Sequence, residues 1–127
     1  MKLVLVVALL AAACDKGDKP PSARDNVIAA WKDAGLAPST FVTAQVQVGS
    51  DCATGMVGGL DVLLCEFPNP TAAQAAEEAG RGWIGLTTGS AQSKGPVLVA
   101  IADRKKSDPS GKLINQLMKL APVEQAK

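Results

Sequence analysis

The side chains of this chain with the widest chemistry are its three cysteines, Cys14, Cys52 and Cys65. A thiolate is a nucleophile and a soft metal ligand, and paired thiols form disulfides in oxidising compartments. The 127 residues include no histidine, which excludes Ser–His and Cys–His dyads, His-ligated zinc and an imidazole general base. Any chemistry of the cysteines must therefore proceed without the usual imidazole partner.

The carboxylates and glycines form no catalytic set in the sequence. Glu77 and Glu78 are neighbours on a predicted helix and do not face each other, and Asp61 and Glu66 fall on opposite faces of a predicted strand. The segment 80–85 matches G-x-G-x-x-G, but it follows a predicted helix rather than a strand, so we expect a helix cap and turns there. We therefore predict no enzyme activity, no metal and no cofactor. A glycan-cleaving pair of acids about 5–9.5 Å apart is an open alternative.

The N-terminus has the pattern of an export signal. Lys2 gives a positive start, and residues 3–13 are an unbroken apolar run. As a helix this run spans roughly 17 Å, too short for a bilayer core of about 30 Å. It ends in Leu10-Ala-Ala-Ala-Cys14, which resembles the lipobox of bacterial lipoproteins, with Ala11 where the family usually has Leu. The resemblance implies cleavage before Cys14 and acylation of that cysteine, palmitate being a typical acyl group.

Lipidation would divide the chain into three parts. Residues 1–13 would be the signal peptide, residues 14–21 the lipidated Cys14 with a flexible tether, and residues 22–127 a single small domain. Two or three acyl chains hold a protein stably on a membrane, so the membrane is the implied partner of Cys14. The resemblance places the domain in the cell envelope, facing the periplasm or the cell exterior, at the inner or the outer membrane. The tether residues 15–21 reach at most about 25 Å when extended.

With Cys14 assigned to the lipid, Cys52 and Cys65 remain as an even pair in an exported chain, and we expect a disulfide between them. The closed ring would stabilise the fold by about 3 kcal/mol in the chain-entropy description. Two alternatives stay open at this point. The cysteines are reduced and act as small apolar side chains, or they bind Cu(I) together with Met56.

The pattern of apolar and turn-forming residues predicts alternating helices and strands. Helices are expected where apolar residues recur at helical spacing: 22–35, 71–79 and from Asp108-Pro109 to Pro122. Strands are expected where residues alternate or are apolar on both faces: 41–48, 60–67 and 97–102. Segments rich in glycine and polar residues are expected to be loops: 49–59 and 80–95.

These elements predict a small α/β sandwich, an α+β arrangement in the order α-β-β-α-β-α. We expect strands 41–48 and 60–67 to form an antiparallel hairpin with a long loop. A helical crossover from 60–67 to 97–102 would make those two strands parallel. The expected product is therefore a three-stranded mixed sheet with packed helices.

A candidate partner surface comes from one aromatic and one basic cluster. Trp83 lies in the expected 80–95 loop, where it either anchors a partner or packs in the core. The cluster Arg104, Lys105 and Lys106 either contacts an anionic partner, which is lipid headgroups or cell-wall polymer, or forms a solvated turn. A formal net charge of +1 and only four aromatic residues argue against nucleic acid as a partner.

The sequence as a whole favours a membrane-anchored envelope lipoprotein with a non-enzymatic binding or accessory domain. An export and lipidation signal precedes a domain without a catalytic set. The alternative function is a lipoprotein that binds a small ligand or a soft metal through the 49–59 loop and the cysteine pair.

Overall fold

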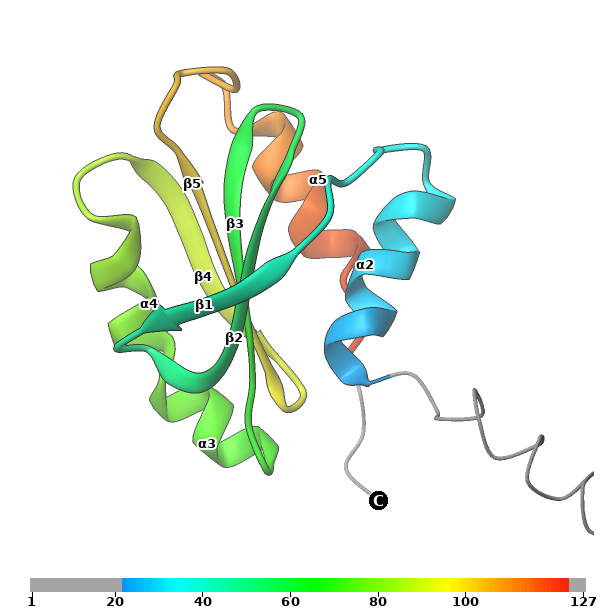
Figure 1. Cartoon of the computed structure of the whole chain (residues 1–127). Helices are drawn as coiled ribbons and strands as arrows, with labels where there is room; N and C mark the ends of the chain where they lie inside the picture. Colours follow the sequence, from blue (N-terminus) through cyan, green and yellow to red (C-terminus); the bar gives the residue numbers. More distant parts are fainter. Residues whose placement is uncertain (1–21, 124–127) are drawn as a thin grey trace, which may run out of the picture.

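A computed structural model of the chain describes residues 22–123. The expected signal peptide, Cys14 and the expected tether lie outside the described residues. The domain is a five-stranded antiparallel sheet with helices on both faces (Figure 1). The strands are β1 (Val42–Val46), β2 (Gly49–Val57), β3 (Leu60–Glu66), β4 (Thr88–Lys94) and β5 (Val97–Asp103). The helices are α2 (Ala23–Asp33), α3 (Pro70–Ala75), α4 (Glu77–Ile84) and α5 (Lys112–Leu120).

The strand order across the sheet is β1-β2-β3-β5-β4, and every neighbouring pair is antiparallel. The chain leaves β3, passes through α3 and α4, and enters β4 on the far side of β5. Because β3 and β4 both run antiparallel to β5, they point in the same direction with β5 between them. The connection is therefore a split β-α-β unit, in which the expected crossover is present but ends at a different strand.

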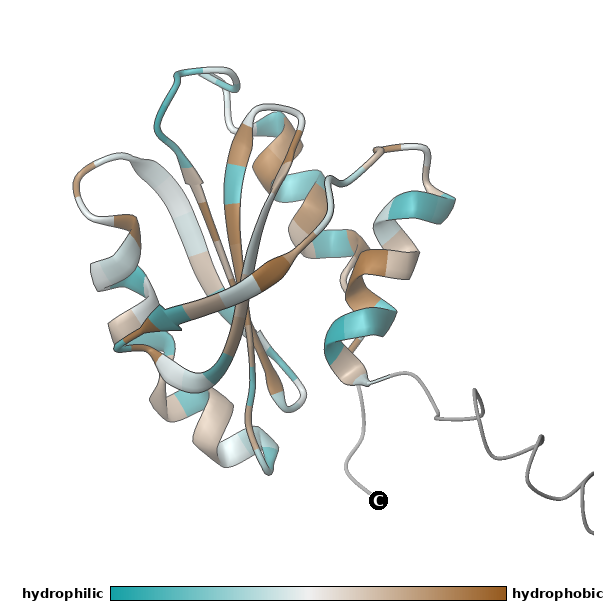
Figure 2. Cartoon of the chain, in the orientation of Figure 1, coloured by the Kyte–Doolittle hydropathy of each residue, from teal (hydrophilic) through white to brown (hydrophobic). Residues whose placement is uncertain are grey.

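Each face of the sheet has its own core. On one face, Val27 and Trp31 of α2 and Leu117 of α5 pack against alternate residues of β3 and β5. On the other face, Ile84 of α4 packs against the intervening residues, with Cys65 among them. Figure 2 shows apolar residues concentrated in the central strands and polar residues in the β5–α5 loop. Burial on both faces explains why β3 and β5 read as continuous apolar runs rather than alternating ones.

Helix α2 confirms the expected helix 22–35 in detail. The Ser22 hydroxyl accepts a 3.1 Å hydrogen bond from the Asp25 N–H, and the Asp25 carboxylate accepts one from the Ser22 N–H, which completes a capping box. Gly35 follows the helix with φ +82°, the left-handed conformation expected after a helix end. The fully buried Trp31 donates a 2.9 Å hydrogen bond to the Leu117 carbonyl, so α2 and α5 are held together.

The three-stranded mixed sheet was wrong because two segments expected to be loops are strands. Residues 49–57 form β2, which lies between β1 and β3, so strands 41–48 and 60–67 do not pair with each other. Only Gly58 and Gly59 form the turn, with φ values of +58° and +85°, a two-residue connection that suits a hairpin. Two phenylalanine rings cover glycines of β2. A Cβ at Gly55 would lie 2.6 Å from the Phe41 ring, and a Cβ at Gly49 would lie 3.0 Å from the Phe67 ring.

The expected 80–95 loop is also wrong, because it contains the end of α4 and the whole of β4. Its strand forms a hairpin with β5, which makes 60–67 and 97–102 antiparallel rather than parallel. The expected helix 71–79 is instead two short helices, α3 and α4, that meet at Ala76. The expected helix start at Asp108-Pro109 is early by three residues, since α5 begins at Lys112. No helix between residues 22 and 123 is long and apolar enough to cross a bilayer.

Candidate functional site

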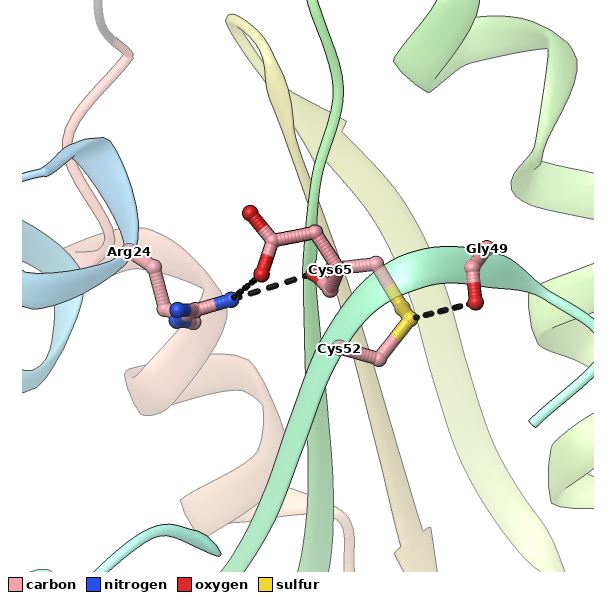
Figure 3. The surroundings of a disulfide bond; sticks show 5 residues. Arg24, Gly49, Cys52 and Cys65 are labelled. Carbon is pink, nitrogen blue, oxygen red and sulfur yellow. Dashed lines mark hydrogen bonds and ion pairs between the residues drawn. A yellow bond between two sulfur atoms is a disulfide. The ribbon is translucent and has the colours of Figure 1, made fainter. Parts of the chain in front are cut away.

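The disulfide between Cys52 and Cys65 is present and joins β2 to β3 (Figure 3). The two residues are direct partners in the strand register, with their Cα atoms 4.0 Å apart, and both are buried. The Arg24 guanidinium from α2 lies beside this pair and bonds the carbonyl and the carboxylate of Asp51, each at 3.0 Å. The disulfide therefore acts as a staple between strands inside one core of the domain.

The disulfide bears on the soft-metal alternative, because it joins the two sulfur atoms that would bind the metal. Neither cysteine between residues 22 and 123 has a free thiol, and the expected 49–59 loop is strand β2 followed by a two-residue turn. No group of three or more His, Cys, Asp or Glu side chains in that part of the chain is placed to hold a metal ion.

Trp83 and Arg104 are brought together at the end of the sheet where β5 leaves it. The Arg104 guanidinium lies 4.5 Å from the centroid of the Trp83 ring and donates a 2.6 Å hydrogen bond to the Trp83 carbonyl. It also donates a 3.2 Å bond to the carboxylate of Asp61 on β3. Trp83 is half-buried, so it is neither a loop residue nor a sealed core residue. The indole thus has a fixed position with part of its surface open to a ligand.

Two recesses flank the Trp83–Arg104 pair. The first has a volume of about 460 Å³ and lies between α4 and the turn that joins β1 to β2, with Ala79, Gly82 and Trp83 on the helix side. The second has a volume of about 370 Å³ and lies between the α4–β4 loop and the β5–α5 loop, with Leu86, Arg104 and Lys106 in its lining. Leu86 has a relative exposure of 106% and makes an apolar tip beside the second recess. We call Trp83, Leu86, Arg104, Lys105 and Lys106 the tryptophan surface.

The turn that carries Lys105 and Lys106 is held from inside by Asp103. The Asp103 carboxylate, only 4% exposed, accepts hydrogen bonds from the N–H groups of Ser107 at 2.7 Å and Asp108 at 2.8 Å. Asp108 in turn accepts a 2.9 Å bond from the Ile114 N–H in the first turn of α5. Lys106 has φ +58°, a left-handed conformation that costs an L-residue about 1–2 kcal/mol. Buried acceptors therefore impose a strained turn whose lysines point to solvent.

A third acid, Glu77, accepts hydrogen bonds from Ser93 on the edge strand β4. Its carboxylate accepts bonds from the Ser93 backbone N–H at 2.8 Å and from the Ser93 hydroxyl at 2.9 Å. These two hydrogen bonds, the backbone one first, lower the pKa of Glu77 below its ordinary value of 4.5. Since β4 is an edge strand, the carboxylate occupies a backbone donor that would otherwise be free to pair with another chain.

The structure brings together some of the site residues that the sequence predicts. Cys52 and Cys65 are joined, Trp83 and Arg104 are in contact, and Lys105 and Lys106 are exposed on the adjoining turn. Sequence reasoning missed three residues of this region: Leu86, Asp61 and Asp103. For Asp103 a local signal exists, because an aspartate at the end of a strand commonly accepts N–H bonds from the following turn. Leu86 and Asp61 join the surface only through the fold, since their partners are distant in sequence.

Comparison with known proteins gives no relative on which a family could be assigned. No family model, no curated protein and no solved structure matches the chain. The functional argument therefore rests on the residues and contacts described above.

Proposed function

We propose that this chain is a lipid-anchored protein of the bacterial cell envelope whose folded domain is a non-enzymatic binding module. The anchoring part rests on Lys2, the apolar run 3–13 and Cys14, which together resemble a lipoprotein signal. In this proposal acyl chains on Cys14 attach the protein to a membrane and the domain faces the periplasm or the cell exterior.

One observation carries the binding part of the proposal: the indole of Trp83 is clamped by Arg104 between two recesses. A binding hot spot needs an aromatic side chain that is rigid before the partner arrives, because ordering a mobile side chain costs affinity. Arg104 supplies this rigidity through a contact with the ring and a bond to the carbonyl of the same residue. The fully exposed Leu86 extends the apolar part of the surface.

Metabolic labelling with radioactive palmitate tests the anchoring part. The full chain should incorporate label, and the Cys14→Ala variant should not. The double variant Cys52→Ser/Cys65→Ser is the matched control, because it removes two cysteines and should keep the label. Label that persists in Cys14→Ala, or is lost in the double variant alone, would contradict lipidation at Cys14.

Photo-crosslinking in native membranes tests the binding part. A photoreactive amino acid replaces Leu86 on the tryptophan surface or Lys32, an exposed residue of α2, in the full chain. We expect a crosslinked product from position 86 that depends on Trp83, and none from position 32. Thermal melting of Trp83→Ala checks that the domain still folds. Equal products from both positions, or a product from position 86 that a folded Trp83→Ala retains, would contradict the proposed surface.

A further inference from the structure

Two lysines of the tryptophan surface have no ion-pair partner in the part of the chain that the structure describes. Lys105 and Lys106 are exposed and form no ion pair with any residue from 22 to 123. The two acids of the same turn, Asp103 and Asp108, are buried and bond backbone N–H groups instead. A ligand of this turn should therefore supply negative charge.

The same surface also offers apolar contacts of side-chain size. Leu86 is fully exposed on the α4–β4 loop, and Lys106 and Leu86 line the same recess of about 370 Å³. On the other side of Trp83, the recess of about 460 Å³ is walled by Val46 and Val48 and floored by Gly82, which leaves open space where another residue would have a Cβ. A polypeptide can insert side chains into such recesses, whereas a flat lipid surface leaves them unfilled.

The surface lies at the end of the domain opposite to the start of α2. The Ala23 N–H donates to the Glu66 carboxylate at one end of β3, while Arg104 bonds Asp61 at the other end of the same strand. Figure 1 shows the first turn of α2 and the β5–α5 loop at opposite ends of the molecule. The chain that leads to Cys14 therefore enters the domain far from the tryptophan surface.

The length of chain before α2 limits how the domain can turn on a membrane. A domain of about a hundred residues has a radius of gyration of about 13 Å, which for a sphere gives a width of about 33 Å. Residues 15–21 reach at most about 25 Å. With Cys14 held at the membrane, the tether is too short to let the tryptophan surface lie on the same membrane. A protein attached through Cys14 would therefore present that surface away from its own membrane.

Resting on the proposed function, we propose that the tryptophan surface docks an acidic polypeptide segment with an apolar anchor side chain, presented from the side away from the membrane. Acidic side chains of the segment meet Lys105 and Lys106. Its apolar side chain enters one of the two recesses, beside Trp83 or beside Leu86.

Fluorescence anisotropy on the full lipidated chain in detergent tests this partner chemistry. The probe is a labelled peptide in which aspartates flank a central leucine and phenylalanine. The comparison peptides replace either the aspartates by asparagine or the two apolar residues by glycine. The Lys105→Glu/Lys106→Glu variant is matched by Lys32→Glu/Lys119→Glu, which makes the same charge change at exposed residues of α2 and α5.

We expect the probe to bind, and both comparison peptides to bind at least about tenfold more weakly. The Lys105→Glu/Lys106→Glu variant should weaken binding by a similar factor, the control variant should not, and added salt should reduce affinity. Absence of probe binding, or equal loss in both variants, overturns the proposal. Binding to phosphatidylglycerol vesicles that depends on Lys105 and Lys106 also overturns it, in favour of a lipid ligand. If the peptide does not bind but position 86 still forms its crosslink, the acidic-peptide proposal fails and the proposed function stands. If that crosslink is also lost, both proposals fail.

Discussion

The guanidinium of Arg104 stacks on the ring of Trp83 and bonds the carbonyl oxygen of the same tryptophan. The two residues come from different elements, α4 and the turn after β5, so this contact links the helix to the basic turn. Asp61 holds the other side of the guanidinium from β3. The position of the indole is therefore set by three parts of the fold rather than by its own helix alone.

Replacing Arg104 by glutamine should loosen the indole of Trp83. The cation–π contact and the bond to the carbonyl are both lost, at a cost of about 1 kcal/mol in the free energy of unfolding. Acrylamide quenching of tryptophan fluorescence should increase, and the increase reports on Trp83 because Trp31 is fully buried. Arg24→Gln is the control, since it removes a comparable ion pair with Asp51 at the other end of the sheet. An equal rise in quenching in both variants would show that the Arg104 contact is not what fixes the ring.

Two glycines of α4 should respond to alanine in opposite ways. A Cβ at Gly82 meets nothing within 4 Å, so Gly82→Ala should stabilise the helix by about 1 kcal/mol. A Cβ at Gly80 would lie 3.0 Å from Leu98 and 3.1 Å from Ala91, and the overpacking should cost about 1–3 kcal/mol relative to Gly82→Ala. Urea denaturation measures both. In addition, Gly82→Ala narrows the recess beside Trp83 and should weaken peptide binding in a more stable protein. Equal stability of the two variants would disprove the packing difference.

The left-handed backbone at Lys106 should be relieved by glycine. Lys106→Gly should raise the free energy of unfolding by about 0.5–1 kcal/mol, because the native strain exceeds the entropy that glycine adds to the unfolded chain. Ala37 has φ +51° and is the matched control, since Ala37→Gly should stabilise by a similar amount. Only Lys106→Gly should weaken binding of the acidic peptide. Thermal denaturation and anisotropy of both variants check this, and weaker binding in Ala37→Gly would break the link between the turn and the ligand.

The hydrogen bonds from Ser93 should make part of the stability depend on acid. Because the pKa of Glu77 is lowered in the folded state, its contribution is complete above about pH 4.5 and disappears as the pH falls through the lowered folded value. Melting temperatures of the wild type and Glu77→Gln should therefore differ near neutral pH and converge in acid. Glu78→Gln is the control, because the Glu78 side chain is exposed and forms no ion pair with residues 22–123. A gap between wild type and Glu77→Gln that is constant with pH would contradict the effect.

The parts of the fold with strong local signals could be predicted from the sequence. Helix α2 has a capping box and a helical stripe, and β3 and β5 are continuous apolar runs. With Cys14 assigned to the lipid, Cys52 and Cys65 are the two cysteines left to pair, and the structure contains their disulfide. These features depend on residues close in sequence or on a choice between few partners.

The two missed strands depend on contacts that local sequence does not encode. Gly55 in β2 is covered by Phe41, and Gly89 in β4 leaves room for the Ile101 carbonyl, since a Cβ there would collide with that oxygen. In the sequence alone such glycines indicate a loop, because the distant residue that packs against each glycine is not known. Without β4, the crossover from β3 leads to β5, and the predicted sheet is mixed. The candidate surface was found only in part for the same reason, as Asp61 reaches Arg104 through the strand order.

Fluorine NMR of the full chain labelled with 5-fluorotryptophan tests the central claim most directly, because one of its two tryptophans lies at the proposed binding surface and the other in the core. The protein is titrated with envelope fraction from bacterial cells that express it. A binding module that uses the tryptophan surface predicts a shift or broadening of the Trp83 resonance, which Lys105→Glu/Lys106→Glu reduces, while the Trp31 resonance stays in place. A Trp83 resonance that is unchanged by the envelope fraction, or that shifts equally in that variant, would contradict it.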